Sequence, residues 1–214
     1  MLISEMITEE RIDVRASLRD DIVRVAPADA EAAVGIITSA FSRDPVNRWI
    51  YPRAVDYFTN FPEFVWAFSG RSFTSGTAFC TPDGTGAALW LPPGEEPDEG
   101  AIMSHVERTT SAEVKKDLMP VLEMMGEMHP LEPHWYLPMI GVDTYSQGRG
   151  AGSALMNHAV SMIDEAGMPA YLESTNSRNI PLYQRFGFTV TGIIEHGACP
   201  PIYPMYRAAR GKGA

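Results

Sequence analysis

Three glycines recur at every second position in the segment 147–152, which reads QGRGAG. They follow an apolar run (WYLPMIGV) and precede a run of helical periodicity (SALMNHAVSMI), so a strand is expected to turn into a helix there. A helix N-terminus offers unpaired N–H groups and partial positive charge, and it binds phosphate where no side chain blocks it. Gly148, Gly150 and Gly152 would let the backbone wrap round such an anion, and Arg149 would add charge at the rim. The segment predicts a phosphate or pyrophosphate site; the alternative is a turn that only eases tight packing.

Two common phosphate-binding loops do not fit this segment. A Walker loop ends in Gly-Lys-Ser/Thr, whereas here Gly152 is followed directly by Ser153. A dinucleotide fingerprint needs GxGxxG, whereas the spacing here is GxGxG and falls late in the chain. The segment is therefore neither a Walker loop nor a dinucleotide fingerprint.

Two stretches in order resemble the GCN5-related N-acetyltransferase (GNAT) family. GVDTYSQGRGAGSALMNHAV matches the family's acyl-CoA loop, Gln/Arg-x-x-Gly-x-Gly/Ala, at Gln147, Gly150 and Gly152. LESTNSRNIPLYQRFGFTV is similar to its second signature, an Asn-bearing loop, a short helix with a Tyr, and then Gly-Phe. The resemblance is strong over residues 134–192 and weaker but consistent over 22–91. The C-terminal half is most similar to puromycin N-acetyltransferase-type members.

The resemblance implies an α/β (α+β) GNAT-like fold, acetyl-CoA as co-substrate and no metal. Its sheet would be mixed and mostly antiparallel, flanked by helices, with the acyl-CoA cleft between two central strands. The backbone of 140–142 would pair with pantetheine like an added strand, or would simply be core strand, and 148–153 would bind the pyrophosphate. The implied cofactor-binding residues are Ile140, Gly141, Val142, Gln147, Gly148, Arg149, Gly150, Ala151, Gly152, Ser153, Asn176, Asn179 and Tyr183.

Acetyl transfer from a thioester to an amine also needs a stabilised oxyanion and a protonated leaving thiol. By resemblance, the backbone N–H near Val142 faces the thioester carbonyl and is the oxyanion candidate. Tyr183 sits where the family's general acid sits, four residues before the Gly-Phe pair. A phenol with a pKa of about 10 stays protonated at neutral pH and can protonate a thiolate with a pKa of about 8.5. The alternative is a packing tyrosine.

Asn176 and Asn179 would bind the cofactor or cap the helix, and capping is preferred for Asn179.

The general base is expected on the short strand in MPAYLES. Side chains alternate along a strand, so Tyr171 and Glu173 face one side and Leu172 faces the other. Glu173 would reach the cleft directly or through water, or would be a solvated carboxylate at the end of the strand. Asp44 and Glu195 are weaker candidates. Water alone could deprotonate the amine, in which case no dedicated base is needed.

Aromatic residues crowd the first half of the chain. Some have the spacing of three and four that suits one buried helix face, namely Tyr57, Phe61, Phe64 and Phe68. Others fall at loop or strand ends and are predicted to line the pocket for the acceptor substrate: Trp49, Tyr51 and Trp90. The histidines lack metal-ligand spacing, and two cysteines are too few for a zinc site or a disulfide framework.

Strands and helices that must position these residues intermix along the chain. Periodicity and turn residues predict a strand at 22–25, a helix from Asp29, and an aromatic helix broken or kinked near Pro62. Two strands, in SFTSGTAFC and GAALWLPP, and two helices, over 98–108 and 112–128, follow. After the strand HWYLPMIGV come the helix to about residue 165, the MPAYLES strand, a short helix from Pro181 to Gly187, and final strands in FTVTGIIEH and IYPMYRA.

Length and composition bound the function. The 214 residues, 45% hydrophobic and 21% charged, suit one N-acetyltransferase domain over 21–210 with a peripheral segment over 1–20. The formal charge of −10 argues against nucleic-acid binding, and no run suggests a signal peptide or membrane span. We therefore expect a cytoplasmic monomer or homodimer that binds a small-molecule amine. The expected reaction is transfer of acetyl from acetyl-CoA to a primary amine by direct attack in a ternary complex. The alternatives are a noncatalytic CoA-binding or sensory module and an acyltransferase acting on a protein amine.

Overall fold

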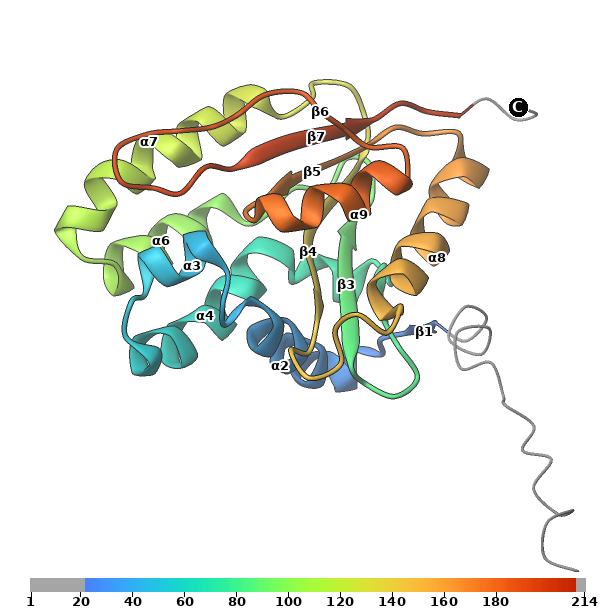
Figure 1. The fold of residues 1–214 in the computed structure, drawn as a ribbon, viewed down its shortest axis with the longest axis horizontal. Helices are drawn as coiled ribbons and strands as arrows, with labels where there is room; N and C mark the ends of the chain where they lie inside the picture. Colours follow the sequence, from blue (N-terminus) through green and yellow to red (C-terminus); the bar gives the residue numbers. More distant parts are fainter. Residues whose placement is uncertain (1–21, 211–214) are drawn as a thin grey trace, which may run out of the picture.

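Seven strands form one sheet in the order β1-β2-β3-β4-β5-β7-β6 in a computed structural model, which describes residues 22–210 (Figure 1). The predicted peripheral segment 1–20 lies outside the described residues. All neighbouring strands pair antiparallel except β4 and β5, which are parallel, so the predicted mixed, mostly antiparallel sheet is confirmed. The strands are β1 Val23–Arg24, β2 Ala78–Cys80, β3 Gly86–Leu91, β4 Trp135–Val142, β5 Ala170–Ser174, β6 Thr189–Val190 and β7 Tyr203–Arg207.

Helices cover both faces of this sheet (Figure 1). Residues 87 and 89 of β3 belong to a core shared with α2, α4, α6 and α7, whereas 88 and 90 belong to a core shared with α8 and α9. This division follows from the alternation of side chains along a strand. The helices are α2 Ala30–Phe41, α3 Pro45–Ile50, α4 Ala54–Ser69, α5 Arg71–Thr74, α6 Glu99–Thr109, α7 Ala112–Met128, α8 Ala151–Ala166 and α9 Ile180–Arg185, with short 3₁₀ turns η1 Pro27–Asp29 and η2 Ser177–Asn179.

The aromatic helix α4 runs through Pro62, so of the two predicted alternatives, a break or a kink, the break is wrong. Proline removes one backbone donor, and the carbonyl that loses its partner belongs to residue 58, whose side chain is exposed. Water can satisfy that carbonyl. Tyr57 and Phe61 are fully buried on the predicted face, which keeps the helix in place across the proline.

The stretch FTVTGIIEH is also less regular than predicted. Pairing is limited to β6 at Thr189–Val190 and one bridge between Ile194 and Ile202. Between them a Cβ built on Gly192 would lie 2.2 Å from the Met128 side chain, so the chain passes tightly over the end of α7 there.

The two central strands separate after a short parallel ladder. β4 and β5 pair at Trp135 with Ala170 and at Tyr136 with Tyr171. Farther along, β4 stays paired with β3 as far as Val142, and β5 stays paired with β7. The pairing of β3 with β4 also shifts by one residue around Pro138, a β-bulge that bends β4 where it leaves β5. The fold thus opens a gap at the centre of the sheet.

Candidate active site

Backbone amides of β4 face this gap. The Asp143 N–H donates to the Thr85 carbonyl of the neighbouring β3 side over 2.8 Å. Because amide directions alternate along a strand, the N–H groups of Ile140 and Val142 point to the opposite side, toward β5. The Val142 carbonyl points the same way and accepts a hydrogen bond from Gln147 Nε2 over 3.0 Å. The structure therefore places the predicted backbone groups on the open edge of β4.

Gly141 has a separate packing role. A Cβ added there would lie 2.4 Å from the Ala40 Cβ on α2. The absence of a side chain lets α2 lie directly against β4 beside the gap.

The glycine segment joins β4 to α8 in left-handed backbone conformations. Gly148 and Gly150 have φ values of +76° and +101°, which favour glycine. Gly150 occupies the N-cap position of α8 and offers no side-chain cap, so the first N–H groups of the helix remain available to a ligand. A cavity of about 940 Å³ lies beside the loop and is lined by residues 146–154 together with 140–142.

Four arginines line this cavity, although the chain carries a net charge of −10: Arg43, Arg149, Arg178 and Arg185. Of these four, only Arg149 is predicted to lie at the phosphate site, because it belongs to the glycine segment. The others come from the turn after α2, from η2 and from α9, so no spacing in the sequence could show that they meet. They concentrate positive charge where the glycine loop would receive phosphate.

Tyr183, on α9, lines this cavity and a smaller one beside it. Only 6% of the residue is exposed, and its ring packs edge to face on Phe188 with centroids 6.4 Å apart. Burial, and to a lesser degree the charge of Asp44, raises the pKa of the phenol above its ordinary value of 10. The hydroxyl therefore stays protonated over the whole neutral range.

The asparagine cap lies three residues earlier than predicted. Asn176 accepts a hydrogen bond from the Arg178 N–H over 3.1 Å and caps η2. Within the described chain, Asn179 makes no side-chain capping bond, which corrects the prediction for this residue. Pro181 lies near the start of α9 and has no N–H to offer. Both asparagines line the larger cavity.

The smaller cavity, of about 80 Å³, meets the larger one at shared lining residues that include Phe41, Ile140 and Tyr183. Its wall is mostly apolar, with aromatic and aliphatic side chains from α4, α7 and β4. Glu173 supplies a carboxylate to this wall, and 4% of its side chain is exposed. Leu172, predicted on the opposite face of β5, also lines this cavity, whereas Tyr171, predicted on the same face as Glu173, does not, so alternation alone does not assign Glu173 to the cavity. Burial first, and then the Glu173 charge, raises the pKa of Tyr136 and Tyr171 nearby, so both phenols stay protonated.

The weaker base candidates lie in different places. Asp44 is buried at the N-terminus of α3 and lines the larger cavity. Burial raises the pKa of its carboxyl group, although hydrogen bonds from Thr175 and Asn47 oppose the effect. Glu195 is exposed, in the loop that follows β6.

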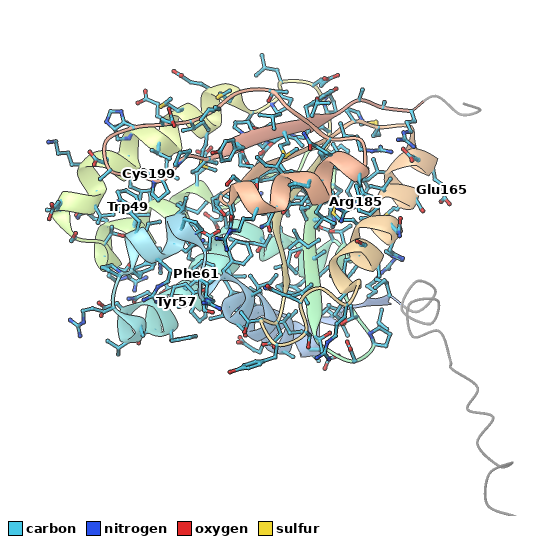
Figure 2. The ribbon with its side chains drawn as sticks, in the orientation of Figure 1. Trp49, Tyr57, Phe61, Glu165, Arg185 and Cys199 are labelled. Carbon is cyan, nitrogen blue, oxygen red and sulfur yellow. The ribbon has the colours of Figure 1, made fainter. Side chains whose placement is uncertain are left out.

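The three aromatic residues predicted for the acceptor pocket lie elsewhere. Trp90 is fully buried in the core under α8, so it presents no surface to a substrate and the prediction for it is corrected. Tyr51 is buried, and its hydroxyl bonds to His105 and Thr109 at 2.9 and 2.7 Å. Trp49 packs on the core from α3, on the opposite side of the view from Arg185 (Figure 2). They occur at element ends, but these ends face the core or a different surface.

Comparisons with known proteins show a likeness to acetyltransferases. The model of the acetyltransferase (GNAT) family matches residues 121–188, which include β4, the glycine loop and Tyr183. An uncharacterized N-acetyltransferase of Schizosaccharomyces pombe is 26% identical over 185 residues, covering 77% of this chain and 72% of that protein.

Solved acetyltransferases share the fold. A structure titled histone acetyltransferase HPA2 and related acetyltransferase, from Corynebacterium glutamicum, has a TM-score of 0.61 and 24% identity, covering 90% of this chain and 98% of its own. An agmatine N-acetyltransferase has a TM-score of 0.59 and 16% identity, covering 87% and 98%. Arylalkylamine N-acetyltransferase 2 from Aedes aegypti has a TM-score of 0.62 and 11% identity, covering 89% and 99%. The chain therefore has the GNAT fold.

Helix lengths bear on the membrane prediction. Over residues 22–210, no helix combines the length and apolarity needed to cross a bilayer.

Proposed function

We propose that this acyltransferase transfers an acetyl group from acetyl-CoA to the primary amine of a small, largely apolar molecule, by direct attack in a ternary complex. The observation that carries the proposal is the meeting of two cavities at Tyr183. One is large and lined by arginines and the glycine loop; the other is small, apolar and lined by Glu173. A donor and an acceptor held in these cavities would meet beside a buried phenol.

The larger cavity supports acetyl-CoA as the donor. Pantetheine would lie in the gap beside β4 and pair with the amides of Ile140 and Val142, as an added strand pairs with a sheet edge. The pyrophosphate would sit on the N–H groups at the start of α8, and the arginines would hold the remaining phosphate charge. This arrangement would point the thioester toward Tyr183.

The groups around that point supply each proton and charge that the reaction needs. The Val142 N–H would donate a hydrogen bond to the oxyanion formed when the amine attacks the thioester carbonyl. Tyr183 would give its proton to the departing CoA thiolate. Glu173 would take a proton from the amine, directly or through water. Attack would form the C–N bond, and the C–S bond would break as the oxyanion collapses. The nitrogen would then lose its second proton, which would return to the Tyr183 phenolate through water, leaving an acetylated amine and free CoA.

The smaller cavity supports a small acceptor rather than a protein side chain. Its volume of about 80 Å³ suits a compact group, and Phe64, Phe68 and Tyr136 make its wall apolar. One carboxylate, Glu173, would attract one ammonium group. We therefore propose a monoamine with an alkyl or aryl body, closer to the arylalkylamines named for one structural neighbour than to agmatine, which is named for another. Similarity to puromycin N-acetyltransferases and a cytoplasmic location remain predictions.

The first test is calorimetric titration with acetyl-CoA and, separately, with adenosine. Tight binding of acetyl-CoA with little response to adenosine is expected, because pantetheine and phosphates supply the contacts. Release of free thiol is then measured with phenethylamine, hexylamine, agmatine and a lysine peptide. Turnover with the first two amines is expected. Binding without turnover of any amine would favour the noncatalytic module, and turnover of the peptide alone would favour a protein substrate. Absence of binding would refute the proposal.

A further inference from the structure

A histidine cluster lies behind Glu173, outside both cavities. His129, just after α7, has its Nδ1 3.8 Å from Glu173 Oε1. Its other nitrogen, Nε2, is 2.9 Å from His134 Nε2 and 3.8 Å from Glu96 Oε2. The side chain of Glu173 is 4% exposed, that of His129 18% and that of Glu96 61%. These groups form a path from a buried carboxylate to the surface.

The hydrogen bonds orient the two rings. His134 Nδ1 is 2.7 Å from the Glu132 carbonyl oxygen, which can only accept, so His134 carries its proton on Nδ1. Burial lowers the pKa of His134, which favours the neutral ring with a lone pair on Nε2. That lone pair accepts the hydrogen of His129 Nε2. A neutral His129 therefore has its own lone pair on Nδ1, on the side of Glu173.

We propose that His129 is a proton relay that takes the acceptor's proton from Glu173 and releases it at the surface; this rests on the proposed function. The ammonium group of the acceptor gives one proton to the Glu173 carboxylate. The protonated carboxyl passes it to His129 Nδ1, across one water or a small rotation that closes the 3.8 Å separation. His129 then loses the proton from Nε2 to solvent or Glu96, and proton exchange with water moves the remaining hydrogen from Nδ1 back to Nε2, which restores the bond to His134 before the next turnover. Glu173 is again a carboxylate and the amine is a neutral nucleophile.

The relay explains why a catalytic carboxylate can be so deeply buried. Without a second group, the proton on Glu173 could leave only through the occupied cavity. An imidazole takes up and releases protons near neutral pH, and it can do so at two different atoms. The groups facing His129 are Glu173 and Tyr171 from β5, Tyr136 from β4, His134 and Glu96. The two phenols stay protonated, so only the carboxylates and His134 can exchange a proton with it.

The alternative role for His129 is packing, because its ring lies edge to face on Tyr136 and Tyr171 with centroids 4.8 Å apart. Two substitutions separate the roles. His129→Gln keeps a polar side chain of similar reach but cannot carry a proton. His129→Ala leaves a space that, at 18% exposure of the original side chain, is open to imidazole from solution. The control is His196→Gln, because His196 is exposed and outside the cluster.

The experiment measures kcat, the KM of the amine and the melting temperature from pH 6 to 9, with and without about 100 mM imidazole. We expect both His129 variants to lose kcat about tenfold or more and to keep the affinity for acetyl-CoA. We expect a changed pH profile, and recovery by free-base imidazole in His129→Ala but not in His129→Gln. The His196→Gln variant should match the wild type.

Three results would overturn the relay. They are a kcat within twofold of the wild type in both variants, a loss that imidazole leaves unchanged in a folded His129→Ala protein, and an unaltered pH profile. Glu173→Gln separates this failure from that of the proposed function. If it loses activity while the His129 variants do not, Glu173 is the base and the relay is wrong. If it keeps full activity, both the base and the relay are wrong. If the wild type acetylates no amine, both the proposed function and the relay are wrong.

Discussion

The hydroxyl of Thr175 donates a hydrogen bond to Asp44 Oδ2 over 2.5 Å and so joins the end of β5 to the start of α3. The other oxygen of Asp44 accepts from the backbone N–H and the side-chain amide of Asn47, at 3.1 and 2.9 Å. Asp44 lines the larger cavity and Thr175 lines the smaller one. One partly buried hydrogen bond therefore connects the walls of both cavities.

Replacing Thr175 by Val should lower the free energy of unfolding by about 1–3 kcal/mol, because a buried carboxylate loses a donor. Burial already raises the pKa of Asp44 above 3.8, so the folded state holds its proton more tightly than the unfolded state. The Asp44 contribution to stability is therefore greatest below pH 3.8 and falls as the pH rises through its folded pKa. Thr175→Val should enlarge this fall. Urea unfolding at several pH values tests it, with the exposed Thr189→Val as control; equal free energies for Thr175→Val and the wild type would contradict it.

Substitutions at the glycine loop should depend on position. Gly150→Glu should weaken acetyl-CoA binding by at least about tenfold, because it places bulk and negative charge beside the pyrophosphate and forces a side chain into φ +101°. Gly152→Ala is the control, because its added Cβ would make ordinary contacts at 3.7 Å with Leu182 and Val142. It should keep its affinity within about threefold and gain helix propensity. Calorimetry measures both variants. Unchanged affinity in Gly150→Glu would refute the loop as the phosphate site.

The variant Tyr183→Phe should bind acetyl-CoA with unchanged affinity but lose about 10²–10⁴-fold in kcat, because only the proton donor is removed. Since the pKa of Tyr183 is raised above 10, the wild-type rate should not fall from deprotonation of this phenol at pH 9. Thiol release at pH 6–9 measures both effects. A Tyr183→Phe enzyme with near wild-type kcat would mean that water or another group protonates the thiolate.

Arg178→Gln should raise the Kd of acetyl-CoA about three- to tenfold, since an exposed charge beside the cavity is partly screened by water and salt. The loss should shrink as ionic strength rises, because the wild type itself binds more weakly in salt. Arg24→Gln, on β1 and outside the lining of the cavity, serves as control. A loss of the same size in both variants would show that overall charge, and not this cavity, governs binding.

Trp90→Phe tests the corrected assignment of that residue. It should destabilise the protein by about 1–3 kcal/mol through lost core volume and leave the KM of the amine within about twofold. Phe68→Leu is the matched comparison, since Phe68 lines the smaller cavity and its loss should raise that KM. Thermal unfolding and steady-state kinetics measure both. A raised KM of the amine with normal stability in Trp90→Phe would show that Trp90 belongs to the acceptor site and that the correction is wrong.

The sequence was most informative where chemistry depends on local backbone or alternation. The spacing of Gly148 and Gly150 marked the turn before α8, and the period of two along β5 predicted that Glu173 and Leu172 face opposite sides, although both line the smaller cavity. Both signals are local, since they need only the conformation of one segment.

Groups brought together from distant segments were not predictable in the same way. Arg43, Arg178 and Arg185 meet at one cavity only after three elements have packed. Trp90 lies one residue before the end of β3, a position that suggests exposure, but α8 covers that end of the strand. No sequence pattern connects His129 with Glu173, because their contact depends on where α7 ends relative to β5. Tertiary packing decides all three cases.

The short ladder at the centre of the sheet has a consequence for the lifetime of the protein. Between residues 22 and 210, β4 and β5 are tied by two residue pairs. A donor bound in the gap would make hydrogen bonds with the β4 amides that β5 leaves unpaired. It would bind only the folded chain. At a concentration 100 times its Kd, such a ligand adds about 2.7 kcal/mol to the free energy of unfolding. A larger supply of acetyl-CoA would then lower the fraction of molecules in which the two halves of the sheet have separated. Proteases cleave such open molecules, so the protein would be degraded more slowly.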